Sequence, residues 1–269
     1  MKKSIFYLFS LALLSSCVNV NADKGDVTDL FSGKKGTGPI TEKTLEGSID
    51  KIEVSTSIHA EVVKSETEKV VISAPSDIMN YIKVENNGGK LHIYVNSGFG
   101  RGISTQNVKA KIYVKDFSSI SADSSADIQV KDTFTQDKVE VEVSSSGSIN
   151  VSNLEANDLK IESNSSGDFS GKVWAVNLTA EANSSGDINI FGKAKNASME
   201  ANSSGGIKAS ELMVENALLE ASSSGDISVS VTKSLKAEAN SSGEVTVFKK
   251  GNLDSVQTEK NSGGDIYLK

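Results

Sequence analysis

Apolar and polar residues alternate in short runs along most of the chain from about residue 40 onward. One example places Leu178, Ala180 and Ala182 before a polar corner and Ile188 and Ile190 after it. A period of two with the apolar residues on one side is typical of half-buried β-strands. No apolar stripe at helical spacing accompanies the pattern, so it predicts an all-β protein.

The polar corner between these runs recurs eight times with small changes. Its versions are DSSADIQV, SSSGSINV, NSSGDFSG, NSSGDINI, NSSGGIKA, SSSGDISV, NSSGEVTV and NSGGDIYL. Successive corners are 21, 20, 19, 19, 20, 18 and 21 residues apart. A nearly constant period of this length marks a solenoid, in which each coil is buried against its neighbours. We therefore expect a parallel β-helix of about 20 residues per coil, with coils ~4.8 Å apart.

The corner composition predicts a tight turn. Gly has no steric cost in the left-handed backbone region and Asn has a small one, so these residues are expected to take that conformation. One column of the predicted stack contains Asn164, Asn183, Asn202 and Asn240. We expect their side-chain amides to hydrogen-bond from coil to coil, as in other stacked β structures.

The first residues predict export and lipid anchoring. Lys2 and Lys3 precede an apolar run that ends in Leu14-Ser15-Ser16-Cys17. This run has the order and size of an export signal and is too short to span a membrane. Its end resembles the bacterial lipobox, in which the cysteine carries lipid and begins the mature chain. Cys17 is the only cysteine in the sequence, and the alternative is a plain secretory signal that leaves a free thiol.

This pattern divides the chain into three parts. Residues 1–16 are expected to be a lipoprotein signal peptide, residues 17–39 a flexible polar tether, and residues 40–269 a single β-helix domain. Within the domain, residues 40–117 predict irregular coils that begin and cap the helix, with a hairpin turn at ENNGGKL. Residues 118–269 are expected to form the regular Ser-Gly coils. Thr258 and Lys260 replace an inward apolar pair in the last coil, which suits an exposed edge that must not recruit another strand.

Charge narrows the range of partners. The chain has 28 basic and 35 acidic residues, and without residues 1–16 its net charge is about -9. This negative net charge disfavours nucleic acid as a partner. Two outward acidic columns are predicted beside the corners. The glutamate column contains Glu142, Glu162, Glu181, Glu200, Glu220, Glu238 and Glu259, and the aspartate column contains Asp127, Asp168, Asp187, Asp226, Glu244 and Asp265.

Stacked carboxylates ~5 Å apart repel by roughly 0.8 kcal/mol per pair in water, before salt screening. One interpretation is a solubilising surface that lysines such as Lys160 and Lys236 partly neutralise. The other is an acidic face that weakly binds divalent cations or a basic partner. No cofactor is expected, and the sequence indicates no definite metal site.

Signals of catalysis are weak. His59 and His92 lie at polar positions of strand patterns, where partly covered or solvent-facing imidazoles are expected, and no cluster with metal-ligand spacing is found. Arg101 lies in a glycine-rich loop. For Trp174, the only tryptophan, we expect packing in the core or at its rim, with sugar stacking as the alternative. We therefore expect a protein that is not an enzyme.

The lipobox, the segment GSIDKIEVSTSIHAEVVKSETEKVVIS, the GGKLHIYV hairpin and the Ser-Gly corners together resemble the head GIN domain family. The resemblance covers roughly residues 45–269, with Ala126 in the first corner and Gly171 at an inward position as departures. The family comprises exported bacterial proteins described as adhesins of autotransporter type. The resemblance implies a single-stranded right-handed β-helix, a role in adhesion and no catalytic residues.

Together these observations predict a cell-envelope lipoprotein of the outer membrane that binds a protein or glycan without catalysis. A polysaccharide-active enzyme similar in fold to pectin lyases is one alternative, and a periplasmic scaffold or stress-related component is another. The ligand, the membrane leaflet, and any pairing of coil edges into dimers or trimers stay open.

Overall fold

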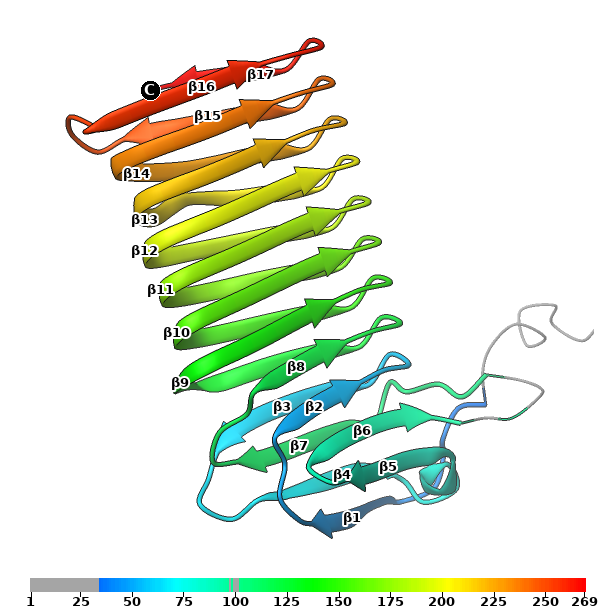
Figure 1. The fold of residues 1–269 in the computed structure, drawn as a ribbon. Helices are drawn as coiled ribbons and strands as arrows, with labels where there is room; N and C mark the ends of the chain where they lie inside the picture. Colours follow the sequence, from blue (N-terminus) through cyan, green and yellow to red (C-terminus); the bar gives the residue numbers. More distant parts are fainter. Residues whose placement is uncertain (1–33, 97, 99–101) are drawn as a thin grey trace, which may run out of the picture.

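The computed structural model describes residues 34–96, 98 and 102–269. The chain is almost entirely β-structure and forms a solenoid of about eight turns of roughly 20 residues each. Figure 1 shows the coils stacked in one direction, with polar corners along one edge and bends along the opposite edge. The predicted parallel β-helix is confirmed.

The regular coils are built from strands that wrap around the solenoid. They are β8 (Ser119–Ala122), β9 (Asp127–Val143), β10 (Ser148–Asn164), β11 (Asp168–Asn183), β12 (Asp187–Asn202), β13 (Gly206–Ala221), β14 (Asp226–Ala239), β15 (Glu244–Lys249), β16 (Ser255–Lys260) and β17 (Asp265–Leu268). The register places Glu181 opposite Glu200 and Phe169 opposite Ile188. Each strand pairs in parallel with the equivalent strand of the next coil, so side chains about 20 residues apart become neighbours.

Each corner is a turn with two consecutive residues in the left-handed region. In the corner after β11 these residues are Ser184 (φ 51°) and Ser185 (φ 69°), and the Gly186 amide donates to the Asn183 carbonyl oxygen at 2.9 Å. Positive φ at both central positions is the geometry of a type I′ turn. The expectation that glycine takes the left-handed conformation is therefore wrong for most corners, because two serines take it.

The corner glycine is needed for space. A Cβ atom added to Gly186 would lie 2.3 Å from the Ser163 carbonyl oxygen of the preceding coil, and one added to Gly205 would lie 2.2 Å from that of Ala182. The size of the side chain at the corner position is thus limited by the backbone of the neighbouring coil. Ala126 replaces glycine in the first regular corner and stands above Ile58, yet its amide closes the same turn on the Asp123 carbonyl oxygen at 3.1 Å.

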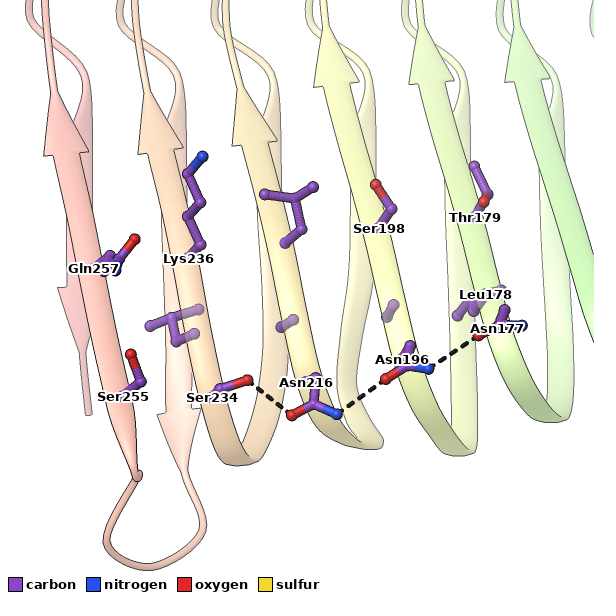
Figure 2. A pocket seen from close by; sticks show the side chains of 14 residues that line it. Asn177, Leu178, Thr179, Asn196, Ser198, Asn216, Ser234, Lys236, Ser255 and Gln257 are labelled. Atoms are coloured by element: carbon purple, nitrogen blue, oxygen red, sulfur yellow. Dashed lines mark hydrogen bonds between the residues drawn. The ribbon is translucent and has the colours of Figure 1, made fainter.

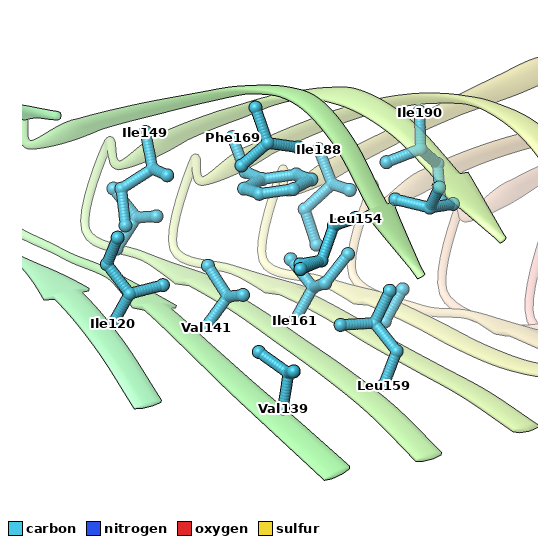
Figure 3. Packing of buried hydrophobic residues seen from close by; sticks show 14 of the residues in the cluster. Ile120, Val139, Val141, Ile149, Leu154, Leu159, Ile161, Phe169, Ile188 and Ile190 are labelled. Carbon is cyan, nitrogen blue, oxygen red and sulfur yellow. The ribbon is translucent and has the colours of Figure 1, made fainter. Parts of the chain in front are cut away.

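The interior is one continuous apolar column. Figure 3 shows inward side chains from the two walls of the solenoid meeting between them, such as Ile149 and Phe169 from one wall and Val141 and Ile161 from the other. These side chains are fully or almost fully buried. Each buried aliphatic or aromatic side chain of this size contributes about 1.5–3 kcal/mol relative to exposure. The alternating pattern therefore stabilises the stack along its whole length.

The N-terminal cap contains β1 (Ile40–Glu46), β2 (Lys51–Val54), β3 (His59–Lys64), β4 (Lys69–Pro75), β5 (Ile82–Asn87), β6 (Lys90–Val95), β7 (Lys109–Val114) and a short 3₁₀ helix, Met79–Tyr81. Its coils are not stacked in chain order. The β2–β3 coil lies between β6–β7 on one side and β8–β9 on the other. The chain therefore forms the β2–β3 coil first and the β6–β7 coil next. It then continues with β8 and β9 on the opposite side of the β2–β3 coil.

Antiparallel strands close the deep end of the stack. β5 pairs with β6 through a tight turn at Gly88 and Gly89, both with positive φ, so the predicted hairpin is confirmed. β1 pairs with β4 and β4 pairs with β7, also antiparallel. At the end of the expected tether, the Gly38 amide donates to the Asp77 carboxylate at 2.9 Å.

The bends opposite the corners, which we call the far edge, absorb the differences in coil length. The register shifts of β10, β12 and β13 lie in this half of the coil, for example between Asn189 and Gly192. Gly171, the departure noted above, has no room for a side chain, because a Cβ atom would lie 2.3 Å from Val151 Cγ2. Irregularity is thus confined to one side of the solenoid.

The last coil ends the stack with exposed polar side chains. Every residue of β16 is exposed, and Thr258 and Lys260 stand above inward Ala237 and Ala239 of the coil below. The Lys260 ammonium lies 3.6 Å from the Asp265 carboxylate. A charged terminal strand of this kind discourages pairing with another sheet edge.

Candidate functional site

Both predicted acidic columns exist and flank the corner edge. The glutamate column is unbroken from Glu142 to Glu259, since each member lies opposite the next in the strand register. The aspartate column lies on the other side of the corners, interrupted by Ser148 and Gly206. The register therefore aligns the seven residues of the glutamate column with one another, and it places the six of the aspartate column in a second line.

Neighbouring amide and ammonium groups bind several glutamates of the glutamate column. The Asn240 amide donates to Glu238 at 2.7 Å, and the Asn261 amide donates to Glu259 at 3.1 Å. Lys160 Nζ lies 2.6 Å from Glu162 and 3.8 Å from Glu181. Asn202, Asn240 and Asn261 thus bind glutamates of their own coil, and no amide ladder links the corner asparagines of the described residues.

Glu181 has the clearest sign of strain within the glutamate column. Its partial burial raises its pKa above the ordinary value, the Lys160 ammonium opposes this, and the neighbouring Glu162 and Glu200 raise the pKa further. Burial and then the adjacent Glu244 likewise raise the pKa of Asp226 in the aspartate column. The stacked carboxylates therefore carry a small electrostatic cost at neutral pH.

The described ranges, 34–96, 98 and 102–269, contain no group of three or more His, Cys, Asp or Glu side chains arranged to hold a metal ion. Adjacent column members come from successive coils ~4.8 Å apart, and each faces outward. The arrangement supplies a line of negative charge. Weak cation binding along it stays a prediction.

A polar ladder runs along the far edge. Asn216 donates to Asn196 and Asn196 donates to Asn177, both at 2.9 Å, and the Ser234 hydroxyl donates to Asn216 at 2.8 Å. Figure 2 shows this chain of hydrogen bonds crossing four coils. An amide ladder was predicted, but the observed one lies six residues before the predicted column, with Asn177 and Asn196 in place of Asn183 and Asn202.

The ladder forms one wall of a shallow groove of about 450 Å³. The other wall is a column that includes Thr179, Ser198 and Lys236, and recessed alanines lie between the walls. Lys236 is the one charged residue that lines the groove. The groove therefore offers hydroxyl and amide groups along the axis of the solenoid.

The two histidines are partly covered, as expected. His59 Nδ1 lies 2.6 Å from the Asp127 carboxylate at the start of the aspartate column. His92 Nε2 lies 2.9 Å from the Ser55 hydroxyl, and its ring stacks on Tyr94 with centroids 4.5 Å apart. Each imidazole therefore has a local structural partner.

Trp174 does not lie in the core, which was one of the two packing positions expected for it. Its neighbours Val173 and Ala175 are buried, but Trp174 itself points outward from the far edge and is 46 % exposed. Phe191 on the next coil is 43 % exposed. Residues 173–175 alternate between buried and outward positions because this segment is part of strand β11.

Cys17 and Arg101 lie outside the described residues. In the part of the chain that the structure describes, no helix is long and apolar enough to cross a membrane.

Solved structures share this fold. A "putative adhesin" from Parabacteroides distasonis superposes with a TM-score of 0.76 at 19 % identity, covering 87 % of this chain and 99 % of that one. A "putative adhesin" from Bacteroides fragilis gives 0.66 at 18 % identity, covering 88 % and 100 %. A "putative lipid binding protein" from Parabacteroides distasonis gives 0.70 at 22 % identity, covering 88 % and 100 %. At these identities the likeness concerns the fold.

No match was found among curated proteins. The model of one family, described as "Putative auto-transporter adhesin, head GIN domain", matches residues 48–252. This range includes the cap from β2 onward and most of the regular coils, as the resemblance of the corners and the hairpin had indicated. The chain belongs to the head GIN domain family.

Proposed function

We propose that this protein is a lipid-anchored component of the cell envelope, held at the outer membrane through Cys17, that binds a ligand at the cell surface and promotes adhesion without catalysis. The observation that carries the proposal is the repetitive solenoid itself. Its stacked coils present the same outward positions at intervals of ~4.8 Å, which suits contact with an extended partner. Membership of a family described as adhesins agrees with this role.

Each part of the proposal has its own support. The Leu-Ser-Ser-Cys sequence supports lipidation, and the polar residues that follow it supply a tether. The terminal coils end in antiparallel strands at one end and exposed polar residues at the other. The outer surfaces of the two walls, between the N-terminal cap and the last coil, are therefore the extended surfaces available to a ligand.

Two assays test this proposal. Cells that produce the full chain should adhere to a panel of immobilised glycans and matrix proteins better than cells that lack it, and Cys17→Ser should abolish the difference by releasing the protein. Protease added to intact cells should remove the body of the chain. Adhesion that does not depend on the protein would contradict the proposal, and resistance to protease on intact cells would favour the periplasmic scaffold.

The enzymatic alternative rests on the similarity in fold to pectin lyases that the resemblance implies, and a fold alone does not establish an activity. Incubation of the purified chain with uronic-acid polymers, followed by size analysis of the polymer, would detect cleavage.

A further inference from the structure

Large apolar side chains are exposed together on the far edge of β11 and β12. Trp174 and Phe191 are 46 % and 43 % exposed, and Met213 on the following coil is 36 % exposed. Groups of exposed apolar residues on a soluble protein mark surfaces for interaction. We call Lys172, Trp174, Phe191, Lys193 and Lys195 the aromatic-lysine patch.

The patch is positively charged within an acidic stack. Residues 169–180 and 188–199 contain Lys172, Lys193 and Lys195 and no Asp or Glu, whereas residues 118–269 as a whole contain 13 Lys and 22 Asp and Glu. Among the described residues, no salt bridge within 4.0 Å involves any of these three lysines. Their ammonium groups are therefore open to an external anion.

The carboxylates that border the patch already have partners. Glu155, opposite Trp174 in the preceding coil, accepts hydrogen bonds from Asn153 at 2.8 Å and Thr135 at 3.1 Å. Glu215 in the coil that follows Lys195 is paired with Lys233 at 2.6 Å. Neither carboxylate lies within 4.0 Å of a lysine of the patch, and Lys195 acts on Glu215 only over a longer distance.

Aromatic and cationic positions alternate across the two coils. In the strand register, Lys172 lies opposite Phe191 and Trp174 lies opposite Lys193. Paired positions are ~4.8 Å apart, and alternate residues of one strand are ~6.6 Å apart. Each ring therefore has a lysine as its neighbour, in both the strand direction and the stacking direction.

The acidic columns lie farther along the strands from the rings than the lysines of the patch do. Asp168 is four residues before Lys172 on an extended strand, or ~13 Å. Glu181 is seven residues after Trp174, or ~23 Å along the strand. Because the strand bends around the solenoid, these path lengths are upper limits on the separations, and ions screen charges beyond ~8 Å at physiological ionic strength. A ligand at the far edge therefore interacts mainly with the local lysines.

We propose that the aromatic-lysine patch binds carboxylated sugar units of an acidic polysaccharide. Such a polymer carries one ring and one carboxylate in each unit, which matches the neighbouring aromatic and lysine positions. Trp174 and Phe191 stack on the apolar faces of the rings, and the lysines pair with the carboxylates. The inference rests on the proposed adhesive function and names its ligand class.

Calorimetry and fluorescence on the full chain, purified in mild detergent, test this inference. The probe is an oligogalacturonate of defined length, with its methyl-esterified form as an uncharged control and vesicles containing anionic phospholipid as a lipid control. Because Trp174 is the only tryptophan, its fluorescence reports directly on the patch. We expect the oligogalacturonate to change this fluorescence and to bind at least tenfold more tightly than its methyl ester.

Matched variants locate the site. Lys172→Gln, Lys193→Gln and Lys195→Gln combined should lower the affinity about tenfold, and Trp174→Ala should lower it similarly. The control combines Lys208→Gln, Lys236→Gln and Lys249→Gln, which removes equal charge elsewhere, leaves the Lys233–Glu215 pair intact and should change the affinity less than twofold. Melting curves confirm that each variant is folded.

Three outcomes would overturn the inference: equal losses in both triple variants, equal binding of the methyl ester, or a fluorescence response to anionic vesicles alone. If the oligogalacturonate does not bind but the protein still promotes cell adhesion, the ligand assignment fails and the proposed function stands. If adhesion itself does not depend on the protein, the proposed function fails whatever the patch binds.

Discussion

The corner edge and the far edge of the solenoid are built from the same coils but obey different constraints. At the corner edge, two left-handed residues and a residue without a side chain recur in nearly every coil, because the carbonyl oxygen of the preceding coil fills the space. At the far edge, strands shift register and coil lengths vary. The corner edge is therefore nearly identical from coil to coil. The far edge varies between coils, so it can carry side chains that occur on only one or two of them.

The two edges also differ in charge. The corner edge is flanked by two acidic columns that continue through many coils, whereas the far edge carries a local group of lysines and exposed aromatic rings on only two of them. A repeated column acts as a general surface property. A group limited to two coils is the kind of feature expected of a binding site.

The largest expected difference in thermal stability is between substitutions of two adjacent corner glycines, Gly205 and Gly206. Gly205→Ala places Cβ 2.2 Å from a backbone oxygen, whereas Gly206→Ala meets only the end of the Asp187 side chain. We expect Gly205→Ala to lower the melting temperature by about 6–12 °C, equivalent to about 3 kcal/mol, and Gly206→Ala by less than about 2 °C. Similar losses in thermal unfolding would show that close packing at the corner does not limit stacking.

A smaller effect is expected at the far edge. Asn196→Ala removes two hydrogen bonds of the ladder and should cost about 1–2 kcal/mol, or about 3–6 °C in melting temperature. Asn189→Ala, at an exposed position of the same strand, is the control and should change it by less than about 1 °C. If Asn196→Ala behaves like its control, the ladder contributes nothing to stability.

The smallest effect concerns the glutamate column. The folded state raises the pKa of Glu181, so it binds the proton more tightly than the unfolded state does, and stability falls as pH rises through that pKa. Glu181→Gln should therefore raise the melting temperature by about 1 °C at pH 7, where solvent screens much of the repulsion. The gain should vanish below about pH 4, and a gain that is independent of pH would exclude the electrostatic explanation.

The sequence predicts the regular coils well. The spacing of the corners places residues such as Glu181 and Glu200 side by side, because the period of the corner equals the length of a coil. Inward positions follow from alternation wherever strands are unbroken. The fold class, the acidic columns and the hairpin at Gly88 and Gly89 all follow from such local patterns.

Features that depend on contacts between coils were not predictable in this way. Glycine at position 186 is required by the Ser163 carbonyl oxygen, so the local composition suggested the wrong left-handed residue. The inserted position of the β2–β3 coil is fixed by pairing with strands distant in sequence. The outward direction of Trp174 depends on the continuation of β11 through the bend.

Two single-residue insertions within one coil test the difference between the edges most directly. One variant receives an extra glycine between Ser204 and Gly205 at the corner, and the other receives it between Ser210 and Glu211, which lack strand partners in both neighbouring registers. The account predicts a fall in melting temperature of at least about 10 °C for the corner insertion and less than about 3 °C for the far-edge insertion. Equal falls, or a larger fall at the far edge, would contradict it.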